Sequence, residues 1–186
     1  MKISGKKILI LATHGFEQSE LEVPRDKLKE AGATVHVVSP ERGEIRGWDM
    51  KDWGHNVKVD KALDEVSADD YDAIVLPGGQ INPDLLRVNP DALSLIRAFY
   101  EQDKVVAAVC HAPWLLIETG IIRGRKCTSY HSIKTDVINA GGKWENSKVV
   151  TEEGVVTSRN PGDLDAFSAK IIEEVAEGRH ARRHAA

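Results

Sequence analysis

The sequence predicts an α/β protein built on a mostly parallel sheet with helices on both faces. Short apolar runs rich in β-branched residues alternate with longer amphipathic segments, which is the pattern of βαβ units. The runs cover residues 7–12, 34–39, 73–76 and 105–109, and each ends in a turn signal or a polar loop. We expect these four runs to be the central parallel strands.

Two segments have the features of long helices. Residues 19–32 have acidic side chains near the start, basic side chains near the end, and Gly32 as a stop signal. Because proline is tolerated only in the first turn of a helix, we expect the regular helix to begin near Pro24. Residues 164–176 have apolar side chains at helical spacing, which predicts a closing amphipathic helix packed on the core.

The remaining segments predict smaller elements. Residues 41–63 contain three glycines and the alternating run 57–59, which indicates a small antiparallel excursion. After residue 110 we expect a short helix to Thr119, a strand near residues 127–130 and a helix over 132–140. Residues 149–158, with Glu153-Gly154 at the centre, are typical of a β-hairpin.

Composition favours one soluble domain. The chain has 186 residues, 41% apolar and 29% charged, with a net charge of −4. We expect a single domain over residues 1–178 and a flexible basic tail over 179–186. Dispersed basic residues predict no specific nucleic-acid binding. The apolar run near the N-terminus is too short for a membrane span and lacks a signal-peptide cleavage pattern, so a cytoplasmic location is expected.

The two cysteines point to thiol chemistry rather than to a structural role for the pair. In a reducing compartment a disulfide between Cys110 and Cys127 is not expected. Without a C-x-x-C motif or a histidine cluster, no metal site is predicted, and no cofactor is expected.

Polar residues gather at the predicted strand ends. Ligands of open α/β sheets bind beyond the carboxyl ends of the strands, so these positions are candidate site residues. They comprise residues 14–17 after the first run, 77–79 after the third, 110–111 after the fourth and 158–161 after the hairpin.

Cys110 has the setting of a nucleophile on a tight turn between a strand and a helix. Ala108 lies two residues before it and Ala112 two residues after it. A sharp turn around a nucleophile needs small residues at these two positions, as in the G-x-S-x-G motif. Pro113 suits the first turn of a helix. That helix N-terminus is expected to lower the pKa of the thiol. The alternative is a small buried residue at a strand end.

Other candidates carry weaker signals. Cys127 lies in a predicted strand without a neighbouring base and is expected to be structural. The backbone N–H groups of Gly78 and Gly79, with that of His111, are suited to an oxyanion site, although a plain tight turn fits equally. Asn82 is suited to capping the next helix.

Several motifs together resemble the ThiJ/PfpI superfamily, and within it the PfpI and YhbO-like branch. The resemblance runs nearly end to end and is far more specific than any single motif. Its residues are Glu17, residues 76–79, Cys110-His111, and the segments 124–130, 136–142 and 158–167.

The resemblance implies a flavodoxin-like sandwich that assembles as homodimers or larger homo-oligomers. It implies Cys110 as the nucleophile, with Glu17 hydrogen-bonded to its sulfur through a carboxyl group of raised pKa. It further implies that His111 pairs with an acid from another subunit, and the matching position is Asp84. Ala112 stands where the family usually has Gly. Further candidates for lining the substrate pocket, from their positions on the strand-end loops, are His14, Tyr130 and Arg159.

Three functions remain open from the sequence. The resemblance implies a stress-protective deglycase or glyoxalase that acts on glyoxal, methylglyoxal or their adducts on proteins and nucleotides, by attack of Cys110. The second hypothesis is an intracellular PfpI-type cysteine peptidase that uses Cys110, His111 and Asp84. The third is a redox sensor or holdase in which Cys110 is oxidised without turnover.

Overall fold

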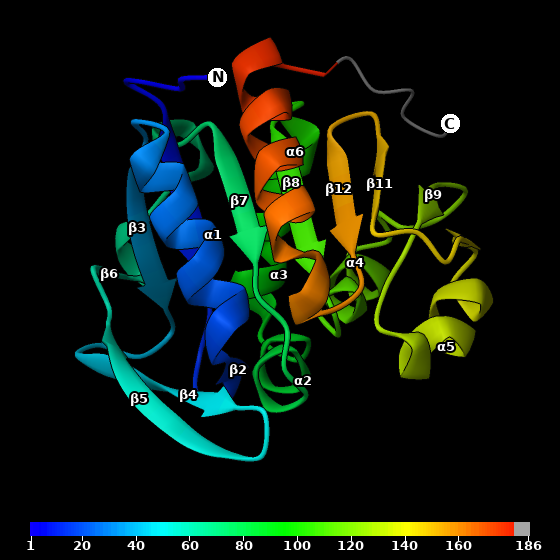
Figure 1. Cartoon of the computed structure of the whole chain (residues 1–186), viewed down its shortest axis with the longest axis horizontal. Coiled ribbons are helices and arrows are strands. Elements are labelled where there is room, and N and C mark those ends of the chain that lie inside the picture. Colours follow the sequence, from blue (N-terminus) through cyan, green and yellow to red (C-terminus); the bar gives the residue numbers. More distant parts are fainter. Residues whose placement is uncertain (181–186) are drawn as a thin grey trace.

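The fold is an α/β sandwich around a seven-stranded sheet (Figure 1). The computed structural model describes residues 1–180. The sheet has the order β11-β12-β8-β7-β1-β3-β6, and all its neighbouring strands are parallel except β11 and β12. Its strands are β1 (Lys7–Leu11), β3 (Thr34–Ser39), β6 (Lys61–Ala62), β7 (Ala73–Leu76), β8 (Val105–Val109), β11 (Val149–Glu152) and β12 (Val155–Ser158).

The four predicted central strands are confirmed, and each of them is buried on both faces of the sheet. In β1, Ile8 and Ile10 join the core on one side of the sheet, whereas Leu9 and Leu11 join the core on the other. This alternation is the period of two that a strand imposes on its side chains. Continuous apolar runs rather than alternating ones are therefore the signature of this sheet.

Helices cover both faces, as predicted. Helices α1 (Gln18–Glu30) and α6 (Leu164–Glu177) lie side by side in front of the sheet in Figure 1, and α3 (Pro90–Glu101) and α4 (Pro113–Glu118) lie behind it. The smaller helices are α2 (Ile81–Leu86) and α5 (Lys134–Asn139). Single 3₁₀ turns cover Leu63–Glu65, Ala68–Asp70, His131–Ile133 and Pro161–Asp163.

Helix α1 begins earlier than the sequence predicted. It starts at Gln18, so Pro24 lies inside the helix instead of near its first residue. The early start places Glu20, Leu21, Pro24 and Leu28 on the buried face. Pro24 has no N–H group to donate to the carbonyl oxygen of Glu20, and the free energy gained by burying this face offsets that lost hydrogen bond.

Two small sheets lie outside the main one. The predicted antiparallel excursion is the hairpin of β4 (Glu44–Asp49) and β5 (Asp52–Lys58), and β2 (Phe16–Glu17) pairs with β4 in parallel. The predicted strand at 127–130 is shorter: β9 (Lys126–Cys127) pairs with β10 (Lys143–Trp144) in a sheet of its own. The predicted hairpin at 149–158 is confirmed as β11 and β12.

The carboxyl ends of β1, β7 and β8 open toward α2 and the β4–β5 hairpin, at the lower edge of Figure 1. The chain moves from β1 to β3 on one side and returns to β7 on the other, so this edge is a topological switch point. No helix within residues 1–180 is long and apolar enough to cross a membrane.

The predicted tail lies almost wholly beyond the part of the chain that the structure describes, since residues 181–186 are outside it. Of its first two residues, His180 donates its backbone N–H to the carbonyl oxygen of Asp103 over 2.9 Å.

Candidate active site

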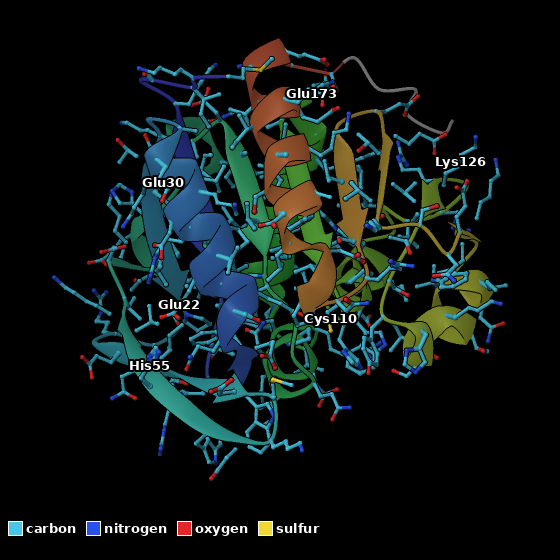
Figure 2. All side chains as sticks on the ribbon, viewed as in Figure 1. Glu22, Glu30, His55, Cys110, Lys126 and Glu173 are labelled. Carbon is cyan, nitrogen blue, oxygen red and sulfur yellow. The ribbon has the colours of Figure 1, made fainter. Side chains whose placement is uncertain are left out.

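Cys110 occupies a sharp turn between β8 and α4, labelled in Figure 2 at the carboxyl end of the sheet. Its φ angle is +65°, a left-handed conformation that costs free energy for a residue with a Cβ atom. Hydrogen bonds hold it there: its N–H donates to the carbonyl oxygen of Ser158 over 3.1 Å, and its own carbonyl oxygen accepts from Tyr130 N–H over 2.8 Å. The expected tight turn is therefore present. Hydrogen bonds with Ser158 and Tyr130 hold Cys110 in its strained backbone conformation.

A cavity of about 510 Å³ reaches the sulfur. Cys110 is only 6% exposed, so the sulfur lies at the base of this cavity. The residues that line it come from six loops or element ends: Glu17, Glu20, Trp48, Met50, Gly79, Gln80, Ile81, Cys110, His111, Tyr130 and Pro161.

The carboxyl group beside the sulfur belongs to Glu20, not to Glu17. Glu20 is fully buried in the first turn of α1, and its Oε2 accepts from the N–H of Gly78 over 2.9 Å. Its pKa is raised to about 8, chiefly by burial, while its interaction with the Cys110 thiol acts in the opposite direction. The placement of Glu17 against the sulfur was therefore wrong. The sequence signal for Glu20 is an acid on the helix face that also carries Leu21 and Leu28.

Glu17 lies at the wall of the same cavity. It is half-buried in β2, and burial raises the pKa of its carboxyl group, while the backbone N–H of Met50 lowers it and the charge of Asp49 raises it. The negative charge of Glu17 also raises the pKa of Glu20. Two carboxyl groups of raised pKa thus face one cavity, and only one of them contacts the sulfur.

The pKa of the Cys110 thiol is raised above its usual range, contrary to the expectation from the helix N-terminus. Burial is the largest cause, and the charge of Glu20 comes second. The N–H groups of Gly79 and His111 act in the opposite direction. Helix α4 has only six residues, and its effect does not offset desolvation by the surrounding core. The resting sulfur is accordingly a thiol that must lose its proton to a neighbouring group.

His111 is the imidazole next to the sulfur and is placed to relay its proton. Its Nδ1 lies 3.1 Å from the Cys110 sulfur, and its Nε2 lies 3.2 Å from Ser132 Oγ. The ring stacks on Tyr130 with centroids 4.8 Å apart. Burial lowers the pKa of His111 to about 4, and the charge of His131 acts in the same direction, so the imidazole is neutral at pH 7. It is a weak base that can hold the thiol proton only in passing, while the sulfur forms its bond to a substrate. Ser132 is a site residue that the sequence did not single out.

Asp84 is exposed on α2, and within residues 1–180 His111 has Ser132, not Asp84, as its Nε2 partner. The contact between His111 and Asp84 of another subunit stays a prediction.

The Gly78-Gly79 turn directs both of its N–H groups at the reactive pair. Gly78 donates to Glu20 Oε2, and the N–H of Gly79 faces both Glu20 and the Cys110 sulfur, which the N–H of His111 also faces. The turn is held by Asn82, which is buried and donates through Nδ2 to the carbonyl oxygens of Pro77 and Gly78 over 2.8 and 3.2 Å. Asn82 therefore positions the turn instead of capping α2, which already begins at Ile81.

Three further candidates divide between the cavity and other surfaces. Tyr130 lines the cavity. His14 does not: its Nδ1 accepts from the N–H of Arg46 and its Nε2 contacts Glu41, on a separate open hollow over the hairpin. Arg159 does not line the cavity either, because its guanidinium is held by Asp163, with Nε donating to Oδ2 over 2.8 Å. The prediction that His14 and Arg159 line the pocket was thus wrong, since nearer polar partners hold both side chains.

The only group of possible metal ligands found within residues 1–180 is Glu174, Glu177 and His180. Glu174 and Glu177 lie at the C-terminal end of α6, whereas Pro161, which lines the cavity, precedes the N-terminal end of this helix. Cys127 is a free, fully buried cysteine beside Gly142.

We expect Gly79→Ala to damage both stability and the site. Gly79 has a φ angle of +79°, and a Cβ atom there would lie 2.6 Å from the carbonyl oxygen of Gly15 and 2.7 Å from the nitrogen of Glu17. Backbone strain of this kind costs about 1–3 kcal/mol before the steric clash is added. Urea denaturation measures the loss.

Gly120→Ala is the matched control, because its φ angle is +76° and a Cβ atom would meet nothing within 4 Å. Gly79→Ala should be the more destabilising of the two by more than about 1 kcal/mol. Equal losses in the free energy of unfolding for the two variants would show that the turn at Gly79 accommodates a Cβ atom.

Comparison with known proteins gives this site a family. The DJ-1/PfpI family model matches residues 6–174, and the chain belongs to the DJ-1/PfpI family. The predicted resemblance to the ThiJ/PfpI superfamily is thereby confirmed.

Three relatives align over nearly their whole lengths. The chain is 43% identical over 167 residues to "Deglycase PfpI" of Pyrococcus furiosus, covering 90% of this chain and 98% of the relative. It is 40% identical to "Protein/nucleic acid deglycase 2" of Escherichia coli, covering 90% and 96%. It is 42% identical to "Putative cysteine protease YraA" of Bacillus subtilis, covering 90% and 97%.

Solved structures agree with the fold. A two-domain protein from Anabaena variabilis with DJ-1/ThiJ/PfpI-like and ferritin-like domains superposes with a TM-score of 0.86 and 34% identity, over 92% of this chain and 48% of that one. Drosophila melanogaster DJ-1beta superposes with a TM-score of 0.83 and 28% identity, over 95% of each chain. The flavodoxin-like α/β sandwich predicted from the resemblance is confirmed.

Proposed function

We propose that this protein is a stress-protective, cysteine-dependent hydrolase that converts glyoxal and methylglyoxal, or their early adducts with amines and thiols, to hydroxy acids. One observation carries the proposal: a buried thiol, a neutral imidazole and two carboxyl groups of raised pKa surround one cavity. The names of the relatives from Pyrococcus furiosus and Escherichia coli support the same chemistry.

The first step is addition of the thiol to an aldehyde. His111 Nδ1, 3.1 Å from the sulfur, takes the thiol proton as the sulfur bonds to the carbonyl carbon. The π bond of the carbonyl group breaks, and its oxygen receives the proton that His111 took from the thiol, which gives a hemithioacetal and returns His111 to its neutral form. The N–H groups of Gly79 and His111, which already face the sulfur, are placed to stabilise the developing negative charge on that oxygen.

The second step requires a proton to move between adjacent carbons. A carboxylate removes the proton from the hemithioacetal carbon and returns it to the neighbouring ketone carbon, while the hydroxyl proton of the hemithioacetal passes to the ketone oxygen, which gives a thioester of a hydroxy acid. Glu20 and Glu17 are suited to this exchange because burial raises the pKa of each toward neutrality. Water then cleaves the thioester, so that methylglyoxal plus water gives lactic acid and the free thiol returns.

A cysteine peptidase is the second candidate, supported by the name of the Bacillus subtilis relative. The cavity disfavours it, because Cys110 is only 6% exposed and Trp48, Met50 and Ile81 line the cavity through which the sulfur is reached. A peptide bond in an extended chain needs access from both directions. A redox role remains the third candidate, and selective oxidation of Cys110 over Cys127 by mild peroxide, measured by mass spectrometry, is its test.

We also propose a homo-oligomer in which Asp84 of one subunit approaches His111 of another. Helix α2 supports this arrangement, because Ile81, Leu85 and Val88 are exposed apolar side chains on or directly after the element that carries Asp84. Sedimentation gives the mass of the native protein. Full activity of a monomer would overturn this part of the proposal. We place the activity in the cytoplasm, where the free thiols of Cys110 and Cys127 stay reduced.

Product identification tests the proposed function. Purified protein is incubated with methylglyoxal, with the methylglyoxal adduct of N-acetylcysteine and with a labelled peptide, and lactate and new amino termini are measured. We expect lactate from methylglyoxal or its adduct and no peptide cleavage. Lactate formation no faster than with Cys110→Ala would reject the proposal, and cleavage of the peptide alone would favour the peptidase.

A further inference from the structure

The outer part of the cavity has a different character from its base. Cys110, His111 and Glu20 are buried at the base, whereas the less buried residues Trp48, Met50, Ile81, Tyr130 and Pro161 form a largely apolar mouth, which Glu17 and Gln80 also border. Methylglyoxal has only a handful of non-hydrogen atoms, while cavities of about 300–1,000 Å³ usually enclose much larger ligands. The volume of about 510 Å³ therefore leaves room beyond the reacting carbonyl group.

Trp48 and Met50 both come from the β4–β5 hairpin, which is anchored next to the reactive carboxyl groups. Trp48 is the register partner of Glu17 in the pairing of β2 with β4. Gly47 packs so closely on the Phe16 ring that a Cβ atom added to Gly47 would lie 3.2 Å from the ring atoms. A substrate group that meets Trp48 is thus held at a fixed place relative to Glu17.

A second contact fixes the other strand of the hairpin to α1. The backbone N–H of His55 donates to Gln18 Oε1 over 3.0 Å, and Gln18 is the first residue of the helix that carries Glu20. Figure 2 shows His55 on this hairpin at the lower left, with Cys110 above it and to its right. The hairpin is accordingly a fixed wall and not a loose loop.

The wall has apolar surface with no cover from the described part of the chain. Met50 is 75% exposed although it lines the cavity. Trp48 is held edge-to-face by Trp53, with ring centroids 5.6 Å apart. An aromatic ring and a thioether are well suited to bind flat or branched apolar groups, because both gain from dispersion and from burial.

We propose that Trp48 and Met50 form a subsite for the apolar substituent of the substrate, so that the enzyme favours aryl or branched alkyl α-oxo aldehydes over glyoxal. The inference rests on the proposed function and names the substrate class of the same site. The reacting aldehyde carbon lies at Cys110, and the substituent on the adjacent carbonyl carbon extends along the hairpin. Glyoxal has no such substituent and leaves the subsite unused.

Steady-state kinetics with glyoxal and phenylglyoxal tests the selectivity. Wild type should show a kcat/KM for phenylglyoxal at least about tenfold above that for glyoxal, the range by which an apolar pocket discriminates. Trp48→Ala and Met50→Ala should each lower this ratio, with about a tenfold effect for Trp48→Ala, and Trp48→Phe should restore most of it. Ile138→Ala, which removes an exposed apolar side chain on α5, should leave the ratio unchanged.

Alkylation of Cys110 tests the subsite without turnover. Iodoacetamide and N-phenyl iodoacetamide are compared by intact mass, and the phenyl reagent should react faster with wild type but lose this advantage in Trp48→Ala. Cys127 is fully buried and serves as the internal reference.

The outcomes separate the two proposals. Turnover of both aldehydes with an unchanged ratio in Trp48→Ala would overturn the subsite while the proposed function stands. No turnover, with a phenyl advantage that depends on Trp48, would overturn the function and support the subsite. A lower native mass of Trp48→Ala or Met50→Ala on sedimentation would show that the wall is a contact between copies and overturn the subsite.

Discussion

Cys110→Ala is expected to lower kcat/KM for methylglyoxal by about 10⁴-fold or more, to the level of the buffer reaction. The reason is that the reaction proceeds through intermediates bonded to the sulfur: His111 Nδ1 lies 3.1 Å from it, and the N–H groups of Gly79 and His111 face it. Without the thiol, neither the hemithioacetal nor the thioester forms. Lactate production at a fixed protein concentration measures the loss.

Cys127→Ala is the matched control for this change. Cys127 is also a buried free cysteine, and burial raises the pKa of its thiol to about 12, but it lies outside the cavity. We expect less than about a twofold change in kcat/KM and a modest loss of stability from the deleted sulfur. Retention of activity in Cys110→Ala, or its loss in Cys127→Ala, would assign the chemistry to another group.

Glu20→Gln is expected to lower kcat/KM by about 10²–10³-fold and to remove the main pH dependence. In wild type, the raised pKa values of Glu20 and Cys110 keep the pair fully protonated below about pH 8. As the pH rises through about 8, the pair loses its first proton and shares the second, so wild-type activity should increase over this interval. Glutamine cannot lose a proton, and the profile of Glu20→Gln should be flat there.

The same carboxyl group predicts how stability depends on pH. The pKa of Glu20 is raised from 4.5 to about 8 in the folded protein, so the folded state binds more protons than the unfolded state between these values. Its contribution is fully present below pH 4.5 and is lost as the pH rises through about 8. The loss amounts to roughly 5 kcal/mol at most, and it should be absent in Glu20→Gln.

Urea denaturation of both proteins at pH 5 and pH 9 measures this difference. Glu17→Gln is the comparison, because its carboxyl group is only half-buried and does not contact the sulfur. It should lose about tenfold in kcat/KM and keep most of the pH dependence. A larger effect in Glu17→Gln than in Glu20→Gln would restore the role that the sequence assigned to Glu17.

The sequence by itself determined the central strands, the helices on both faces and the place of Cys110. Buried parallel strands are continuous apolar runs, so their limits could be predicted: Thr34–Ser39, Ala73–Leu76 and Val105–Val109 match to the residue. Cys110-His111 could be found because a polar pair directly between a buried strand and a proline that begins a helix is typical of a nucleophile on a tight turn.

Only the tertiary structure decided which carboxyl group meets the sulfur. Glu17 and Glu20 are three residues apart, and the choice depends on where α1 begins. With Gln18 as the first helical residue, Glu17 belongs to β2 and faces the mouth of the cavity, while Glu20 turns inward with Leu21. The helix start is set by burial of that face against the sheet, a balance among distant residues that no local pattern contains.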